Sequence, residues 1–275
     1  MKFWKILSNL LVVLEEIFPD WSDRFLSYKS LKQQLNLIYP KPTAACGDEP
    51  PPKRSKLSRA DVADSSDRES KEEEEEEEEA EVTKEVNAAE FLKRLEEEID
   101  KFNDFFVEKE EDYVIAWKEL QDRIRQAKDS NEDLSEVGKK LVDLHGEMIL
   151  LVIYSILNYT GLVKITKKHD KRSGALIRLP FIKGVLQEPF FRTDVVNKLA
   201  KECRTMLEDM FFKKELGEIQ HLESTYVKLT SLALRVLNEI RAGSSTVNPL
   251  SLPPLQSNAA EELKSIPIVE QAAAK

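Results

Sequence analysis

The sequence is poor in the residues on which many folds and catalytic sites depend. Its 275 residues include eight glycines, two cysteines and three histidines. So little glycine argues against a β fold with many tight turns. Cys46 and Cys203 are too few and too far apart for a disulfide framework or a paired-cysteine zinc site, and they fit a reducing, intracellular compartment.

Common catalytic motifs are also missing. The sequence contains no glycine-rich phosphate-binding loop, no nucleophile elbow and no set of residues at metal-ligand spacing. His145, His169 and His221 are scattered along the chain, and each is best interpreted as a structural or surface residue. We therefore expect no enzymatic activity, no metal ion and no resident cofactor.

Long hydrophobic runs are absent as well. The most apolar run, MILLVIYSILNY at 148–159, is shorter than the roughly 18 residues that a membrane-spanning helix requires. We expect it to be a buried core helix. The amino terminus, MKFWKILSNLLVVLEEIF, begins like a secretory signal, but Glu15 and Glu16 stand where small residues would form a cleavage site. We therefore expect an amphipathic helix there, and no membrane span.

The net charge of −10 is concentrated in one segment. Residues 71–85 contain ten Glu and two Lys, so the other 260 residues carry a net charge of only −2. The residues around this acidic run are rich in proline and serine and poor in apolar side chains, and they cannot offset the entropy lost on ordering. We therefore expect a disordered insertion over about 40–87.

Two functional interpretations depend on this segment. Its basic cluster PPKRSK, at 51–56, is either a nuclear-import signal or part of a solubilising linker, since such short motifs are common by chance. The polyglutamate run and the net negative charge argue against direct binding of nucleic acid, which needs a wide basic face.

Elsewhere apolar residues recur at helical spacing, which predicts an all-α fold. The first helix and a second one in 19–38 form an amino-terminal hairpin. Two long antiparallel helices follow, the second of which ends at Gly174. Shorter helices are expected toward the carboxyl end. The predicted segments are the long helices at 88–126 and 134–173, the shorter helices at 192–212 and 217–241, and a disordered tail at 244–275.

The apolar stripe of the 217–241 helix has two possible uses. It either packs back on the bundle or lies outside the compact body and binds a partner. We therefore separate a domain at 1–212 from a carboxyl-terminal amphipathic helix at 213–243. A plain helical interaction scaffold that binds through this helix is the alternative function.

Four lysines gather in KITKKHDKRSG at 164–174. Their spacing of three and four residues places them on one face of a helix, here called the lysine ridge: Lys164, Lys167, Lys168 and Lys171. Cations in a last helical turn are favoured by the helix dipole and often simply face water. Alternatively, these four ammonium groups bind an anion.

Other segments supply donors that favour the anion. Tyr28 and Lys32 are four residues apart and therefore neighbours on a helix, with Lys29 beside them. Lys2 sits at a helix amino terminus, where free N–H groups and the dipole attract negative charge. We hypothesise that these groups converge on an anion.

Several motifs in this order resemble the SPX domain, an all-helical phosphate-signalling module. They are MKF with Lys5, PDW…FLSYKSLK, KITKKHDKRSG and LPFIKGVLQEPFF, and they cover residues 1–212 without the acidic insertion. The later ESTYVKLTSLALRVLNEIRAGSSTVNPLSLPPLQ is similar to the helix and tail of stand-alone plant SPX proteins. Two features depart from the family pattern: Trp4 replaces a usual glycine, and the stretch before Pro19 is longer and more apolar.

The resemblance implies a sensor of cellular phosphate status that binds inositol polyphosphates or pyrophosphates. It implies that the liganded protein binds and inhibits MYB-type phosphate-starvation-response transcription factors, in the nucleus or the cytoplasm. By motif, the ligand-binding residues are Lys2, Tyr28, Lys29, Lys32, Lys164, Lys167, Lys168 and Lys171. Because Trp4 and the altered spacing lie next to Lys2, we expect Tyr28, Lys32, Lys167 and Lys168 to contribute more.

Overall fold

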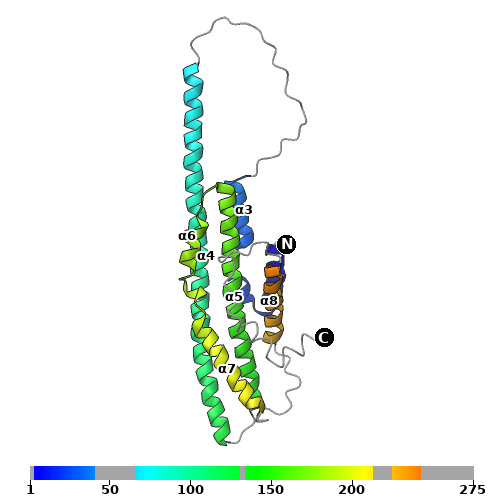
Figure 1. Cartoon of the computed structure of the whole chain (residues 1–275). Helices are drawn as coiled ribbons and strands as arrows, with labels where there is room; N and C mark the ends of the chain where they lie inside the picture. The colour runs from blue at the N-terminus through cyan, green and yellow to red at the C-terminus, as the bar shows by residue number, and fades with distance from the viewer. Residues whose placement is uncertain (1–2, 41–65, 131–133, 213–224, 243–275) are drawn as a thin grey trace. The chain divides into compact units, whose positions relative to one another are not determined.

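The computed structural model describes residues 3–40, 66–130, 134–212 and 225–242, and these residues form helices and no strand (Figure 1). The prediction of an all-α fold is therefore confirmed. The chain divides into two compact units, one of residues 1–29 and 97–275 and one of residues 30–96. The described helices are α1 (Phe3–Ile17), α2 (Pro19–Ser22), α3 (Tyr28–Ile38), α4 (Ser66–Ser130), α5 (Ser135–Ser173), α6 (Arg178–Val185), the 3-10 helix η1 (Pro189–Phe191), α7 (Asp194–Phe212) and α8 (Thr225–Ala242).

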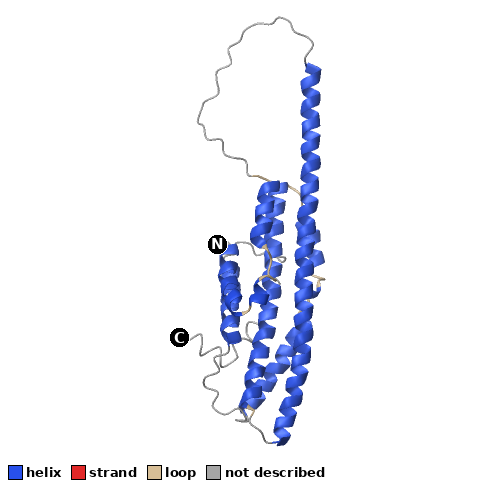
Figure 2. Cartoon of the chain, turned by 180° about the vertical axis from the view of Figure 1, so that it is seen from behind, coloured by secondary structure: helices blue, strands red, loops and turns tan. Residues whose placement is uncertain are grey.

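Helix α5 is the core of the larger unit. It contacts α6, η1, α7 and α8, and both views show α7 and α8 running along it (Figures 1 and 2). By length and composition alone α5 could cross a membrane, but 94% of its most apolar stretch is buried inside the protein. Such burial is what a core helix shows, as expected for 148–159.

Aromatic side chains fill the centre of this unit around Tyr154. The ring of Tyr154 lies 4.9 Å from that of Phe25 and 5.1 Å from that of Phe105. Trp21 and Phe102 pack against the same tyrosine edge to face, an arrangement that aromatic pairs prefer. The second helical segment of the chain is thereby fixed to α4 and α5.

The predicted helix over 19–38 is interrupted. Its apolar spacing is helical throughout, but the structure has α2, then a turn at 23–27, and then α3. Side chains of the long helices bind the backbone of that turn. The Asn158 side chain accepts a hydrogen bond from the Leu26 amide at 2.9 Å, and the Lys101 ammonium group donates to the Phe25 carbonyl at 3.0 Å. These partners replace the hydrogen bonds that a continuous helix would have made.

Helix α4 begins far earlier than predicted. The sequence analysis expected disorder over about 40–87, whereas α4 starts at Ser66, so the prediction is wrong for 66–87. The segment has few apolar residues, but glutamate and alanine have a high helix propensity, which favours a helix there. Acidic residues near a helix amino terminus are also favoured by the dipole. Residues 41–65, including PPKRSK, lie outside the described part.

The smaller unit pairs α3 with the first part of α4. Leu31 and Leu35 of α3 are buried, as are Phe91 and Leu95 of α4. The Arg94 guanidinium group donates to the Gln34 side-chain oxygen at 3.4 Å. The apolar spacing read from the sequence therefore does mark the buried face of each helix.

Helix α8 packs on the larger unit. It contacts α1 and α5 and buries the apolar stripe predicted from the sequence, namely Leu229, Ala233, Val236, Leu237 and Ile240. The Thr230 hydroxyl donates to the Gly146 carbonyl of α5 at 3.2 Å. Of the two uses considered for this stripe, the structure shows packing. Residues 213–224 and the predicted tail from 244 lie outside the described residues.

The connection between α5 and α7 contains two short helices, α6 and η1. The predicted stop at Gly174 is confirmed, because this residue has a φ of 78° in the left-handed region and its amide donates to the Asp170 carbonyl.

Candidate anion-binding site

The lysine ridge occupies the carboxyl-terminal turns of α5. Lys167 and Lys171 are exposed, whereas Lys164 and Lys168 are partly buried. The residues between them, such as Ile165 and Thr166, are fully buried in the core. One face of these turns therefore anchors the helix, and the other presents the cations.

Tyr28 and Lys164 meet at the ring of Phe3. Phe3, in the first turn of α1, lies with its ring centroid 5.1 Å from that of Tyr28. The ammonium nitrogen of Lys164 lies over the same Phe3 ring, 5.8 Å from its centroid. Three helices, α1, α3 and α5, thus each contribute one side chain to a single cluster. Two of the predicted site residues, Tyr28 and Lys164, are brought together in this way.

Burial changes the proton affinities of both polar members of the cluster. It raises the pKa of the Tyr28 phenol, so the hydroxyl stays protonated at neutral pH and serves as a hydrogen-bond donor. Burial, followed by the charge of Lys167, lowers the pKa of the Lys164 ammonium group. The charged form of Lys164 is therefore less favoured than in a free lysine, and a bound anion would offset this.

The remaining predicted site residues are Lys29, Lys32 and Lys2. Lys29 is exposed in the first turn of α3, directly after Tyr28. Lys32 is exposed one turn further along the same helix, but it belongs to the unit of residues 30–96. Its convergence with the lysine ridge therefore stays a prediction. Lys2 lies outside the described residues.

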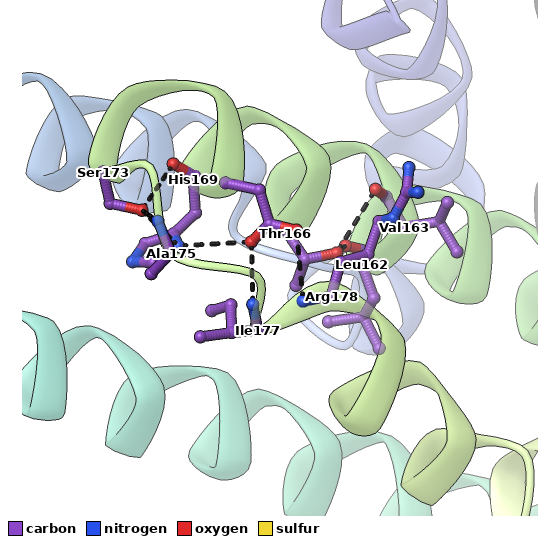
Figure 3. Close-up of polar contacts among 9 residues, drawn as sticks. Leu162, Val163, Thr166, His169, Ser173, Ala175, Ile177 and Arg178 are labelled. Carbon is purple, nitrogen blue, oxygen red and sulfur yellow. Dashed lines mark hydrogen bonds and ion pairs between the residues drawn. The ribbon is translucent and has the colours of Figure 1, made fainter.

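Asp170 connects the end of the lysine ridge to the start of α6. Its carboxylate accepts hydrogen bonds from the amides of Ile177 at 3.1 Å and Arg178 at 3.3 Å, where α6 begins (Figure 3). The Ser173 hydroxyl accepts from the Ala175 amide at 3.1 Å (Figure 3). The only acidic residue between Lys164 and Lys171 thus ties α6 to the last turn of α5. The sequence analysis missed this role, although an aspartate among four lysines was its signal.

Phe3 and Asn158 were also missed. Both are buried and neither titrates, so no charge pattern marks them. Phe3 follows the first lysine of the MKF motif, and this position was its sole signal. Asn158 is a fully buried amide in the apolar run 148–159, and a polar residue in such a run is expected to hold a specific hydrogen bond.

A groove at the other end of α5 is a poorer site for a polyanion. It is a groove of about 450 Å³ between α4 and α5, near the start of α5. Its charged lining consists of three cations, Lys109, Arg123 and Lys140, and four carboxylates, Asp112, Glu119, Asp143 and Glu147. Carboxylates would repel phosphate groups there. In the sequence between Lys164 and Lys171 the one acidic residue is Asp170, and its carboxylate accepts hydrogen bonds from two backbone amides.

Groups that could support catalysis are unfavourably placed in the described part of the chain. No cluster of His, Cys, Asp or Glu among those residues could hold a metal ion. Cys203 is buried, and burial raises the pKa of its thiol, so it is a poor nucleophile. His145 and His169 are buried as well. His221 lies outside the described residues.

Known proteins similar to this chain share one description. The chain is 48% identical to SPX domain-containing protein 1 of Arabidopsis thaliana, over 99% of this chain and 100% of that protein. It is 49% identical to SPX domain-containing protein 1 of Oryza sativa subsp. japonica and 44% identical to SPX domain-containing protein 2 of Arabidopsis thaliana, with the same coverage. No protein-family model matches the chain.

Proposed function

The chain belongs to the family of SPX domain-containing proteins, and from this premise we propose that it senses phosphate status by binding inositol polyphosphates or pyrophosphates. The ligand-binding groups are the lysine ridge, Tyr28, Lys29 and Lys32, with Lys2 at the amino terminus. The protein is a regulator and not an enzyme, and the inositol phosphate is its regulatory ligand. It needs no other cofactor.

One observation carries this proposal. The partly buried Lys164 and the protonated Tyr28 share the Phe3 ring, at the start of a ridge with three more lysines. A phenol donor and several ammonium groups suit a ligand with many anionic oxygens. The Asp170 carboxylate, which lies among these lysines in the sequence, accepts hydrogen bonds from two backbone amides at the start of α6.

Physical chemistry favours a ring with many phosphates over a single phosphate ion. An exposed lysine–phosphate pair in water contributes only roughly 0–1 kcal/mol. A ring that engages several lysines at once loses its translational freedom only once, so the contacts act together. Affinity should fall steeply with salt, since exposed charges are screened over about 10 Å at 0.1 M.

Calorimetry with inositol hexakisphosphate tests the proposal. We expect wild-type protein to bind, and Lys167→Ala plus Lys168→Ala to weaken binding by at least about tenfold, since each lost charge-assisted contact is worth roughly 1 kcal/mol. The matched control is Lys139→Ala plus Lys140→Ala, an exposed lysine pair at the other end of α5. Equal affinity of the two double variants would refute the proposal.

We further propose that the liganded protein binds MYB-type phosphate-starvation-response factors and keeps them from DNA, in the nucleus and the cytoplasm. Because α8 buries its apolar stripe against α1 and α5, that stripe is poorly suited to a scaffold function. A pull-down of a purified factor with and without inositol hexakisphosphate is the test. Capture that is equal in both conditions would favour a scaffold without ligand sensing.

A further inference from the structure

We infer that Phe3, a side chain without polar atoms, is a positioning residue of the anion site: its ring fixes the Lys164 ammonium group beside Tyr28. The inference rests on the proposed function, because it concerns how the same site is held ready for its ligand. Phe3 itself need not contact the ligand. It acts through the two residues that lie against its ring.

The contacts of Phe3 support this role. Only 7% of the side chain is exposed, although it lies in the first turn of α1. Its ring meets the Tyr28 ring edge to face, with 65° between the planes. The Lys164 ammonium group lies over the ring, where the negative face of the π system attracts a cation.

Gly161 makes room for this ring. A Cβ atom at Gly161 would lie 3.5 Å from two atoms of the Phe3 ring and 2.4 Å from the Leu26 side chain. Gly161 stands one turn before Lys164 on α5, so the ring rests on the helix surface directly beside the lysine. The distance to the Phe3 ring is an ordinary van der Waals contact, whereas a larger residue at 161 would have to displace the Leu26 side chain. Glycine therefore allows Leu26 and the Phe3 ring to lie together against this turn of α5.

The energetic reason lies in the long, flexible side chain of lysine. Ordering a free lysine on ligand binding costs conformational entropy, up to about 2 kcal/mol. A lysine whose ammonium group already rests on a ring loses less on binding, which is the general benefit of preorganisation. The ring also offsets part of the hydration that Lys164 loses through burial. Phe3 thus increases affinity while making no contact with a phosphate.

The variants Phe3→Leu and Phe3→Trp test the inference. Leucine keeps apolar bulk and removes the ring, whereas tryptophan keeps a ring. We expect Phe3→Leu to weaken binding of inositol hexakisphosphate on the order of 2- to 5-fold, the range for loss of an exposed cation–π contact, and Phe3→Trp to restore most of it. The control is Phe190→Leu, which removes a fully buried ring that packs on Phe102.

A spectroscopic readout separates positioning from mere stabilisation. Lysines are reductively methylated with ¹³C, and the Lys164 signal is assigned by its loss in Lys164→Arg. In the folded wild type we expect ring current to shift this signal upfield of the other lysines, and the shift to vanish in Phe3→Leu. An unshifted wild-type signal overturns the inference, whether or not Phe3→Leu folds. Equal affinity of Phe3→Leu and Phe190→Leu also overturns it.

Calorimetry distinguishes failure of the proposed function from failure of the role inferred for Phe3. If wild-type protein does not bind inositol hexakisphosphate in calorimetry, the sensor proposal fails. The contact between Phe3 and Lys164 then has no role in anion binding. If wild-type protein binds but Phe3→Leu binds as tightly, only the role of Phe3 is refuted.

Discussion

The amide of Leu26 donates a hydrogen bond of 2.9 Å to the side-chain oxygen of Asn158, and both groups are buried. This bond joins the turn before α3 to the middle of α5. Tyr28 follows two residues after Leu26, and Lys164 follows six residues after Asn158. The same contact therefore fixes the turn that precedes Tyr28 to α5.

Loss of this bond should affect stability and ligand binding together. We expect Asn158→Ala to lower the free energy of unfolding by about 1–3 kcal/mol, because the buried Leu26 amide would lack a partner. Ligand affinity should fall too, since the turn that precedes Tyr28 would no longer be fixed to α5. Urea denaturation and calorimetry measure the two effects. Asn238→Ala, an exposed position on α8, is the control, and a stability loss equal to this control would contradict the account.

Two glycines offer a sharp comparison of packing. Gly161→Ala places a methyl group 2.4 Å from the Leu26 side chain, so we expect overpacking to cost about 1–3 kcal/mol. Gly184→Ala, in α6, meets nothing within 4 Å and should be neutral or stabilise by roughly 0.5–1 kcal/mol. Thermal unfolding of both variants decides. Equal melting temperatures would show that α5 has more room beside Phe3 than the structure indicates.

His145 predicts how stability depends on pH. Burial, and then the charge of Arg204, lowers the pKa of this imidazole to about 4. The folded state therefore binds the proton less tightly than the unfolded state, whose histidine titrates near 6.5. Uncharged His145 therefore contributes roughly 3 kcal/mol to the free energy of unfolding above about pH 6.5. This contribution is lost as the pH falls toward about 4.

The pH effect is checked with His145→Gln, which cannot be protonated. Denaturation at pH 7 and pH 4.5 should show a smaller stability loss for this variant than for the wild type. His221→Gln serves as the control for removing a histidine. An equal pH dependence for His145→Gln and the wild type would rule out His145 as the source.

Deletion of residues 217–275 tests the packing of α8. Because α8 covers apolar surface on α1 and α5, we expect a lower melting temperature and weaker binding of inositol hexakisphosphate, since α1 carries Phe3. A deletion variant that keeps both its stability and its ligand affinity would contradict this. It would instead favour the interpretation that α8 is a separate, partner-binding helix.

The sequence allowed the all-α fold to be predicted because apolar spacing reports which face of a helix is buried. The end of α5 could be predicted because glycine readily adopts the left-handed backbone conformation that ends a helix, as Gly174 does. Prediction from the sequence failed at the turn 23–27, where the periodicity continues and the break depends on Asn158 and Lys101. Tertiary hydrogen bonds of this kind leave no local pattern in the sequence.

The site could be predicted in part for a similar reason. Charge and spacing identify the lysine ridge, since like charges on one helical face are visible in one dimension. The contribution of Phe3 depends on side chains from three helices meeting at its ring, which spacing within one helix cannot reveal. The start of α4 at Ser66 was missed because composition was weighed above helix propensity.

Lysine footprinting tests most directly whether one ligand unites these groups. Acetylation of each lysine is followed by mass spectrometry with and without inositol hexakisphosphate. The account predicts simultaneous protection of Lys32, Lys164, Lys167, Lys168 and Lys171, with Lys139, Lys140 and Lys183 unchanged. Protection of the lysine ridge without Lys32, or uniform protection of all lysines, would contradict a single shared site.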